Sequence, residues 1–205
     1  MKYLTYKDFV EKLSKENQER FLVGGTSVRP DDALQKIITG IQPKVVLEIG
    51  TGFGTSAIAI ASCSTVKKVI TFDIKKSIWP GYLAEKFNLQ EKILYLSAAQ
   101  QEIHTMIKAL KFDLAYIDGA HIPPYTEADF EAVKHCGQVL LDDAYSNYIR
   151  GIVAVNGAFM ISNRFAYWNA ERDYKKAQKI SAAIKSIDQV KDGKLIHSYT
   201  YLKNH

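Results

Sequence analysis

The sequence has 205 residues, of which 47% are hydrophobic and 24% are charged, a balance typical of a soluble globular protein with one full-sized core. Its two cysteines, Cys63 and Cys136, lack a CxxC partner or a histidine at metal-ligand spacing, which excludes a disulfide scaffold and predicts reduced thiols. The net charge of +5 comes from scattered lysines rather than a basic block, so it is only weak evidence for an anionic partner.

The opening residues, MKYLTYKDFVEK, mix charged with apolar side chains, so they do not form the apolar centre of a signal peptide. No later stretch has the uninterrupted apolar length of a membrane span. We therefore expect a cytoplasmic protein that does not use a membrane.

The first expected elements are helices, one amphipathic over residues 6 to 22 and one that opens at Pro30-Asp31-Asp32 and closes at Gly40. Short apolar runs then predict buried strands at 45 to 49, 68 to 74, 93 to 97, 112 to 118 and 138 to 143. Because helix-length segments separate these runs, they predict an α/β fold with a parallel sheet and helices on both faces.

The second half of the chain has weaker patterns. Thr126, followed three residues later by Asp129, resembles a capping box for a helix that Gly137 ends. A further helix is expected over residues 148 to 160. The last two strands are expected at 164 to 169 and 194 to 202, with a helix at 171 to 187 between them.

Polar residues gather at the carboxyl ends of the expected strands, where open parallel sheets bind ligands. In chain order they are Gly50 to Gly54, Asp73, Ser97 to Gln100, Asp118 and the pair Asp142-Asp143. Carboxylates brought together at one edge of a sheet repel one another and lose hydration, so their grouping indicates a ligand or a metal ion.

The glycine loop after the first strand leaves several interpretations open. A P-loop would need a Gly-Lys-Ser/Thr ending, and a dinucleotide fingerprint would need glycine where the sequence has Thr55. In a third interpretation, the spacing Glu48-x-Gly50-x-Gly52-x-Gly54 lets the backbone pass under a bulky amino-acid tail, while the next helix offers N–H groups to a carboxylate. A nicotinamide dehydrogenase remains an alternative, disfavoured by Thr55.

The stretch EIGTGFGTSAIAIA followed by VITFDI resembles the cofactor-binding half of the class I S-adenosylmethionine-dependent methyltransferases. The resemblance implies their three-layer Rossmann-like fold, with a mostly parallel seven-stranded sheet and an antiparallel last strand. It also implies S-adenosyl-L-methionine as the cofactor, bound by Glu48, Gly50, Thr51, Gly52, Gly54, Thr55, Ser56, Asp73, Ala98, Ala99, Gln100 and Asp118.

Each of these positions takes a role from the resemblance. The glycine loop would hold the methionine moiety, with Glu48 near its amino group, and Thr55 and Ser56 near its carboxylate. Asp73 would bind the ribose hydroxyls. Ala98 and Ala99 would border the adenine, whose edge Gln100 could hydrogen-bond.

FDLAYIDGAH followed by VLLDDAY resembles the metal-dependent O-methyltransferases of the catechol and macrolide-sugar type. The resemblance implies a divalent cation, Mg²⁺, held by Asp118, Asp142 and Asp143. Catechol enzymes carry Asp-Asn where this chain has Asp-Asp, as the sugar enzymes do. Three carboxylates suit hard Mg²⁺, which aligns the acceptor oxygen and makes its proton easier to lose.

His121 lies three residues after Asp118, the offset at which the catechol enzymes place a catalytic lysine. We therefore expect His121, with Asp118, to act in catalysis as a general base, because imidazole titrates near neutral pH. The alternative is a loop histidine that only orders the turn before Pro123-Pro124.

These features predict methylation of a hydroxyl on a small molecule, a sugar or a phenol-like compound, assisted by Mg²⁺. One alternative is a methyltransferase acting on RNA or another macromolecule, because basic and aromatic residues interleave over 164 to 179, although an amphipathic helix with a solvated basic face has the same pattern. A non-catalytic S-adenosylmethionine-binding protein is another. The resemblance allows a homodimer and leaves the acceptor open.

We expect one methyltransferase domain over residues 1–205. Residues 1–30 would supply the N-terminal helix and a possible lid at Gly24-Gly25-Thr26-Ser27, and residues 31–160 the cofactor-binding core. Residues 161–205 would supply the C-terminal strands and helix.

Overall fold

The computed structural model describes residue 11, residues 32–162 and residues 164–185. Its elements in chain order are α3 (Asp32–Ile41), β1 (Val45–Ile49), α4 (Thr55–Ala61), β2 (Lys68–Asp73), α5 (Trp79–Lys86), β3 (Ile93–Ser97), α6 (Gln100–Ala109), β4 (Leu114–Ile117), α7 (Tyr125–Val133), the 3₁₀ helix η1 (Lys134–Cys136), β5 (Gln138–Leu141), α8 (Asn147–Asn156), β6 (Phe159–Met160), β7 (Ala166–Asn169) and α9 (Lys175–Lys185).

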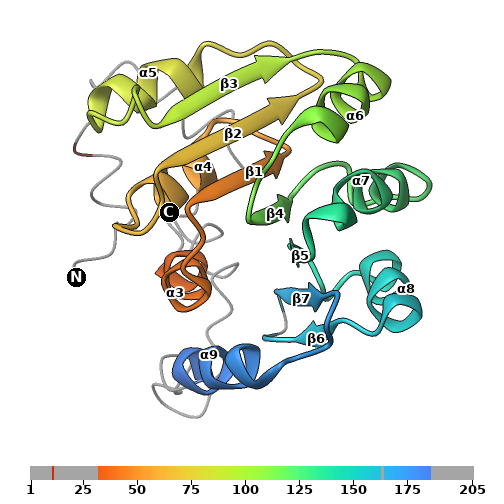
Figure 1. Ribbon diagram of the computed structural model, residues 1–205. Helices are drawn as coiled ribbons and strands as arrows, with labels where there is room; N and C mark the ends of the chain where they lie inside the picture. Colours follow the sequence, from red (N-terminus) through yellow and green to blue (C-terminus); the bar gives the residue numbers. More distant parts are fainter. Residues whose placement is uncertain (1–10, 12–31, 163, 186–205) are drawn as a thin grey trace, which may run out of the picture.

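The strands form one seven-stranded sheet in the order β3-β2-β1-β4-β5-β7-β6 (Figure 1). The strands from β3 to β5 in this order are parallel, while β7 pairs antiparallel with both β5 and β6. The order reverses at β1. The connections that follow the neighbouring strands β1 and β4 therefore lead into opposite halves of the sheet, and this is the position where doubly wound folds bind ligands. The predicted Rossmann-like architecture is confirmed.

Helices cover both faces of the sheet. Residues of α3, α4 and α9 form one apolar core with one face, and residues of α6, α7 and α8 form another core with the opposite face. Successive residues of β1 alternate between the two cores, Val46 packing in the first and Leu47 in the second. Burial on both sides explains why the strands are continuously apolar in sequence.

Two expectations for the second half are corrected. The helix expected over 148 to 160 ends as α8 at Asn156, because Gly157 adopts a left-handed conformation with φ 69°, and Phe159–Met160 form the short strand β6. The predicted capping box is absent: α7 begins after Pro124 without a side-chain cap, and Thr126 lies inside its first turn. Gly137 does end η1 in a left-handed conformation, with φ 84°.

The helix expected over 6 to 22, the possible lid at 24 to 27 and the strand expected over 194 to 202 lie outside the described residues, apart from residue 11. Within the described part of the chain, no helix combines the length and apolarity needed to cross a bilayer. Cys63 and Cys136 are both free thiols.

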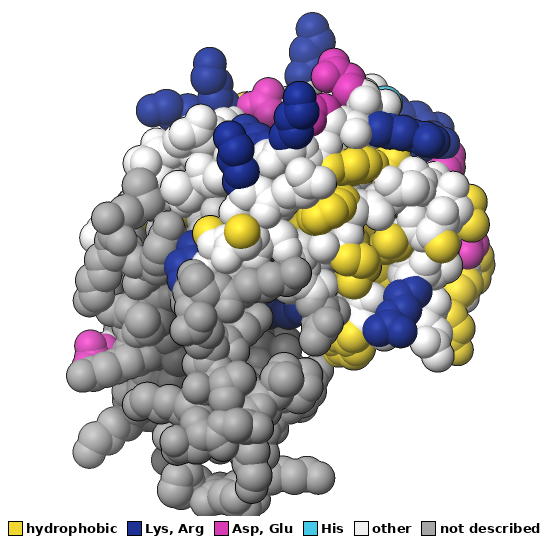
Figure 2. Space-filling view, turned by 90° about the horizontal axis from the view of Figure 1, so that it is seen from below, with side chains coloured by type: hydrophobic (Ala, Val, Ile, Leu, Met, Phe, Trp, Pro, Cys, Tyr) yellow, Lys and Arg dark blue, Asp and Glu magenta, His cyan; other side chains and the backbone are white. Residues whose placement is uncertain are grey.

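One face of the molecule, seen from below the view of Figure 1, carries its Lys and Arg side chains in several separate places (Figure 2). Hydrophobic side chains lie in patches between them on the part that is not grey. The part of this face that is not grey therefore does not present the continuous basic band that a phosphate backbone favours.

Gly40 lies in the last turn of α3, one residue before its end at Ile41, and α9 packs closely against it. A Cβ added at Gly40 would lie 2.5 Å from Cγ1 of Ile180 in α9. An exposed glycine in α8, Gly151, offers a contrast, since a Cβ there would meet no atom within 4 Å.

We expect Gly40→Ala to destabilise the fold by up to about 2 kcal/mol, because overpacking costs about 1–3 kcal/mol and helix propensity returns roughly 1 kcal/mol. Gly151→Ala should stabilise it by up to about 1 kcal/mol. Urea unfolding measures both, and a stabilising Gly40→Ala would contradict the close packing of α3 on α9.

Candidate active site

A cavity of about 1000 Å³ lies at the carboxyl ends of the parallel strands. Most of the residues predicted from sequence line it together: Gly50, Thr51, Gly52, Thr55, Ser56, Asp73, Ala99, Gln100, Asp118, His121 and Asp143. The other predicted residues, Glu48, Gly54, Ala98 and Asp142, are not part of its wall. The volume is within the range that holds a cofactor-sized ligand.

The three glycines after β1 have different reasons to lack a side chain. A Cβ at Gly50 would lie 2.0 Å from the carbonyl oxygen of Asp118, and one at Gly54 would lie 2.8 Å from Cα of Pro80. A Cβ at Gly52 would meet no atom within 4 Å. All three have positive φ values, so Gly50 and Gly54 allow close packing of the chain, whereas Gly52 meets the open cavity.

Asp73, the last residue of β2, is held at the cavity by backbone donors. Its Oδ2 accepts a hydrogen bond from Gly52 N at 2.8 Å, and its Oδ1 accepts one from Lys75 N at 2.8 Å. This pairing fixes the carboxylate against the glycine loop, where its remaining lone pairs can accept from a ligand.

Glu48 is fully buried in β1 behind this loop. Its Oε2 accepts a hydrogen bond from Thr71, whose hydroxyl also contacts the Thr51 hydroxyl at 2.6 Å. Its Oε1 has no hydrogen-bond partner within the part of the chain that the structure describes. Burial raises the pKa of Glu48 to about 8, and the nearby hydroxyls of Ser56 and Thr71 only partly oppose it. The side chain is therefore largely protonated at neutral pH.

Gln100, at the start of α6, is oriented by residues of α7. Its Nε2 donates to Asp129 Oδ1 at 2.9 Å and to the Tyr125 carbonyl at 3.3 Å. His104 Nε2 lies 2.7 Å from the same oxygen of Asp129. Because only the amide NH₂ can donate to two acceptors, the amide oxygen of Gln100 is left to accept from a ligand.

Asp129 is a site residue that sequence reasoning missed. The sequence pattern placed it in a helix cap, whereas its buried carboxylate lines the cavity and joins α6 to α7. The spacing of Asp129 from Thr126 is the same whether Asp129 caps a helix or lines the cavity. Only the packing of α6 against α7 distinguishes the two roles.

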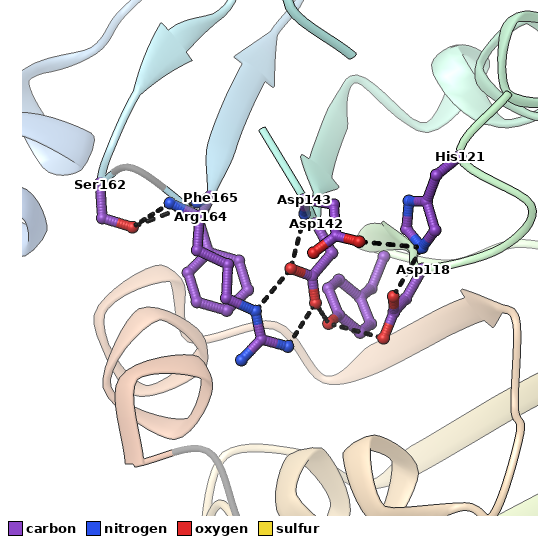
Figure 3. Close-up of polar contacts among 8 residues, drawn as sticks. Asp118, His121, Asp142, Asp143, Ser162, Arg164 and Phe165 are labelled. Atoms are coloured by element: carbon purple, nitrogen blue, oxygen red, sulfur yellow. Dashed lines mark hydrogen bonds and ion pairs between the residues drawn. The ribbon is translucent and has the colours of Figure 1, made fainter. Parts of the chain in front are cut away.

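The acidic cluster consists of Asp118, Asp142 and Asp143, which follow β4 and β5 (Figure 3). The Tyr116 hydroxyl joins two of them: it donates to Asp142 Oδ2 and lies 3.3 Å from Asp118 Oδ2. Burial raises the pKa of Asp118 to about 6; the charge of Asp142 adds to the rise, and the hydrogen bond from His121 opposes it.

Asp142 is fully buried and paired with Arg164. Arg164 Nε donates to Oδ1 at 2.6 Å and its NH2 nitrogen donates to Oδ2 at 2.6 Å, so the pair is bidentate. The backbone N–H of Asp143 also donates to Oδ1 at 2.6 Å. Sequence reasoning missed Arg164, because it stands in an aromatic and basic stretch that predicted a strand and a solvated helix face.

The residues predicted to hold Mg²⁺ do not fit a cation in this arrangement. Both oxygens of Asp142 already accept two hydrogen bonds each, which uses the lone pairs that a metal ion would need. Among the described residues, no group of three or more His, Cys, Asp or Glu side chains is arranged to hold a metal ion.

His121 lies between the other two carboxylates of the cluster (Figure 3). Its Nε2 is 3.1 Å from Asp118 Oδ1 and 3.6 Å from Asp143 Oδ2, while its Nδ1 is buried and has no hydrogen-bond partner among the described residues. Both His121 and Asp143 have left-handed backbones, with φ values of 51° and 49°. Such conformations carry strain and are typical of functional loops.

Two opposing effects act on the His121 imidazole. Burial favours its neutral form, but the hydrogen bond to Asp118 and the charges of the three aspartates outweigh burial and raise the pKa of His121. Ionised carboxylates only accept hydrogen bonds, so Nε2 carries the proton and the lone pair of the neutral ring lies on Nδ1.

Comparisons with known proteins agree with this fold. A family model for rhamnosyl O-methyltransferase/CmcI matches residues 27–135. An O-methyltransferase from Bacillus cereus in complex with SAH has 18% identity and a TM-score of 0.57, over 78% of this chain and 89% of that one. Cofactor-bound Rv0187 from MTB has 15% identity and a TM-score of 0.60, over 78% of this chain and 92% of that one.

A third solved structure is the O-methyltransferase TomG from Streptomyces achromogenes, in complex with SAM, with 15% identity and a TM-score of 0.52 over 91% of this chain and 78% of that one. At these identities the solved structures establish the fold alone. No curated protein matches the chain.

The raised pKa of Glu48 predicts how stability depends on pH. Between its ordinary value of 4.5 and about 8, the folded state binds the proton more tightly than the unfolded state, so the free energy of unfolding should fall as pH rises through this window. Glu48→Gln should flatten the fall, whereas Glu85→Gln, at an exposed position of α5, should retain it. Denaturant unfolding of the ligand-free protein measures this, and parallel profiles for wild type and Glu48→Gln would contradict the buried, protonated carboxyl.

Proposed function

Because this chain belongs to the rhamnosyl O-methyltransferase/CmcI family, we propose that it transfers the methyl group of S-adenosylmethionine to a hydroxyl of a small molecule. The observation that carries the proposal is that the glycine loop and Asp73 line the same cavity as His121. One part of that cavity suits a nucleoside, and the other part holds a side chain, His121, that can accept a proton from a bound hydroxyl.

The cofactor side of the cavity has groups that fit S-adenosylmethionine. The carboxylate of Asp73 is fixed by two backbone N–H groups and can accept hydrogen bonds from ribose hydroxyls. The amide oxygen of Gln100 can accept one from the exocyclic amine of adenine. The unpartnered Oε1 of Glu48 lies behind the loop, where an ammonium group would favour its ionised form.

His121 is the general base in this proposal. S-adenosylmethionine, when bound, would supply a methyl group on a positively charged sulfur: the acceptor oxygen would bond in line to the methyl carbon as the bond from that carbon to sulfur breaks, which leaves S-adenosylhomocysteine. The His121 ring, which lines the cavity, takes the proton of the acceptor hydroxyl, and the imidazolium that forms lies beside the carboxylates of Asp118 and Asp143. Their charges stabilise it where positive charge develops, which is the form of electrostatic catalysis expected in a partly dry cleft.

The acceptor in this proposal is a sugar or a phenol-like compound, as the sequence resemblance suggests. The family description, which names a rhamnosyl O-methyltransferase, supports a small hydroxylated acceptor. The Mg²⁺ expected from sequence has no step in the mechanism, because the described aspartates do not fit it.

Cofactor binding is the first measurement. We expect S-adenosylhomocysteine to bind the purified protein in calorimetry, and Asp73→Asn to weaken the affinity about tenfold or more by removing a charged acceptor. Glu91→Gln, at an exposed position outside the cavity, is the matched control. Binding of NAD in place of S-adenosylhomocysteine would move the chain to the dehydrogenase alternative.

Methyl transfer should be measured on a panel of sugars, phenols and RNA. Transfer to a sugar or phenol supports the proposed acceptor class, and transfer to RNA alone would overturn it. Cofactor binding without transfer to any acceptor would support a non-catalytic binding protein.

Replacing the base gives the test of mechanism. With an accepted substrate, His121→Gln should lower kcat about 10²-fold or more, since a positioned general base contributes 10²–10⁴-fold. The wild-type rate should increase with pH through a pKa above 6.5, as the ring loses the proton that the aspartates hold on it. His135→Gln changes a histidine that contacts the Ala132 carbonyl outside this cavity, and should leave both unchanged. An unaltered rate in His121→Gln would leave His121 as a loop-ordering residue.

A further inference from the structure

We propose that Arg164 replaces a divalent cation at the acidic cluster, so that methyl transfer by this chain needs no bound metal ion. The inference deepens the proposed function, because it concerns how the same site holds its charges. It comes from the contacts of Arg164 with Asp142, which no sequence motif predicted.

The carboxylate of Asp142 is saturated with hydrogen-bond donors. A carboxylate offers about four lone-pair positions, and those of Asp142 accept from Arg164 twice, from the Tyr116 hydroxyl and from the Asp143 backbone N–H. A metal ion that takes oxygen ligands would have to displace at least one of these donors. The position that sequence reasoning assigned to a cation is already filled by donors from the protein.

Arg164 is held beside the acidic cluster by its backbone. Its carbonyl oxygen accepts a hydrogen bond at 2.7 Å from Ala144 N, in the loop that carries Asp142 and Asp143. The antiparallel pairing of β7 with β5 then brings the start of β7 beside the end of β5, where the acidic pair lies. Arg164 therefore reaches Asp142 through the same sheet pairing that builds the fold.

The charges of the acidic cluster are also balanced by side chains of the protein. Asp142 is fully buried, so an unpaired charge there would be costly, and a guanidinium neutralises it without losing its proton. The remaining carboxylates, Asp118 and Asp143, face His121. The cluster thus has one fixed cation and one side chain that can gain or lose a proton, which leaves no uncompensated group of three carboxylates to attract a metal ion.

Arg164 acts in this scheme as a positioning residue. It holds Asp142, which accepts from the Tyr116 hydroxyl, and that hydroxyl lies 3.3 Å from Asp118, the partner of His121. The chain of contacts orients the base from the fixed end, as a metal ion would from its ligand shell.

The test is a titration with Mn²⁺, followed by electron paramagnetic resonance of the free ion and repeated with Mg²⁺ in calorimetry. The wild-type protein should bind neither ion at millimolar concentration. Arg164→Gln should bind Mn²⁺ at least tenfold more tightly than wild type, because the oxygens of Asp142 become available. Arg164→Lys retains the positive charge and should stay at the wild-type level, and Arg164→Gln/Asp142→Asn should lose the acquired binding.

The wild-type titration decides the matter even where Arg164→Gln does not fold, which thermal unfolding and S-adenosylhomocysteine binding report. Wild-type binding of Mn²⁺ or Mg²⁺ that Asp142→Asn abolishes would overturn the proposal. Where a methyl acceptor is known, an unchanged rate after removal of metal with EDTA supports it, and a rate lost with EDTA and restored by Mg²⁺ overturns it. Because the ion titration uses no cofactor, a failure of S-adenosylhomocysteine binding would count against the proposed function alone.

Discussion

The close approach of β1 and β4 at their carboxyl ends is the constraint on which the site depends. Gly50 lies so near the Asp118 carbonyl that any side chain would collide with it, and the backbone N–H of Asp118 donates to the Ile49 carbonyl at 2.9 Å. The glycine loop and the acidic cluster follow these two strands directly. Their contact therefore places the candidate cofactor groups and the candidate base in one cavity rather than on separate faces.

Burial then gives each carboxyl group a different state. Among the described residues no cation acts on Glu48, which is largely protonated at neutral pH. Asp142 is buried with a bidentate arginine, and Asp118 shares a proton donor with Asp143. The environment of each group, rather than the residue type, decides its chemistry. Four acids at one edge of the sheet can therefore have distinct roles.

The sequence was most informative where physical constraints are local. The apolar runs and their spacing predicted the five parallel strands, because strands buried on both faces admit few polar residues. The glycine loop and the residues at the strand ends predicted 11 of the 24 residues that line the cavity. What it could not predict depends on contacts between distant segments. Arg164 meets Asp142 only through antiparallel pairing of β7 with β5, and Asp129 meets Gln100 only through packing of α7 on α6.

The same distinction explains why an acidic motif need not indicate a metal ion. Carboxylates at strand ends give the same sequence pattern whether their counter-charge is an ion or a side chain from elsewhere in the chain. An arginine is always protonated and its two parallel donors match one carboxylate, so it neutralises a buried aspartate while leaving the neighbouring carboxylates to a group that titrates. In this site that group is His121, and its position between Asp118 and Asp143 suits a base that must gain a proton during the reaction and release it afterwards.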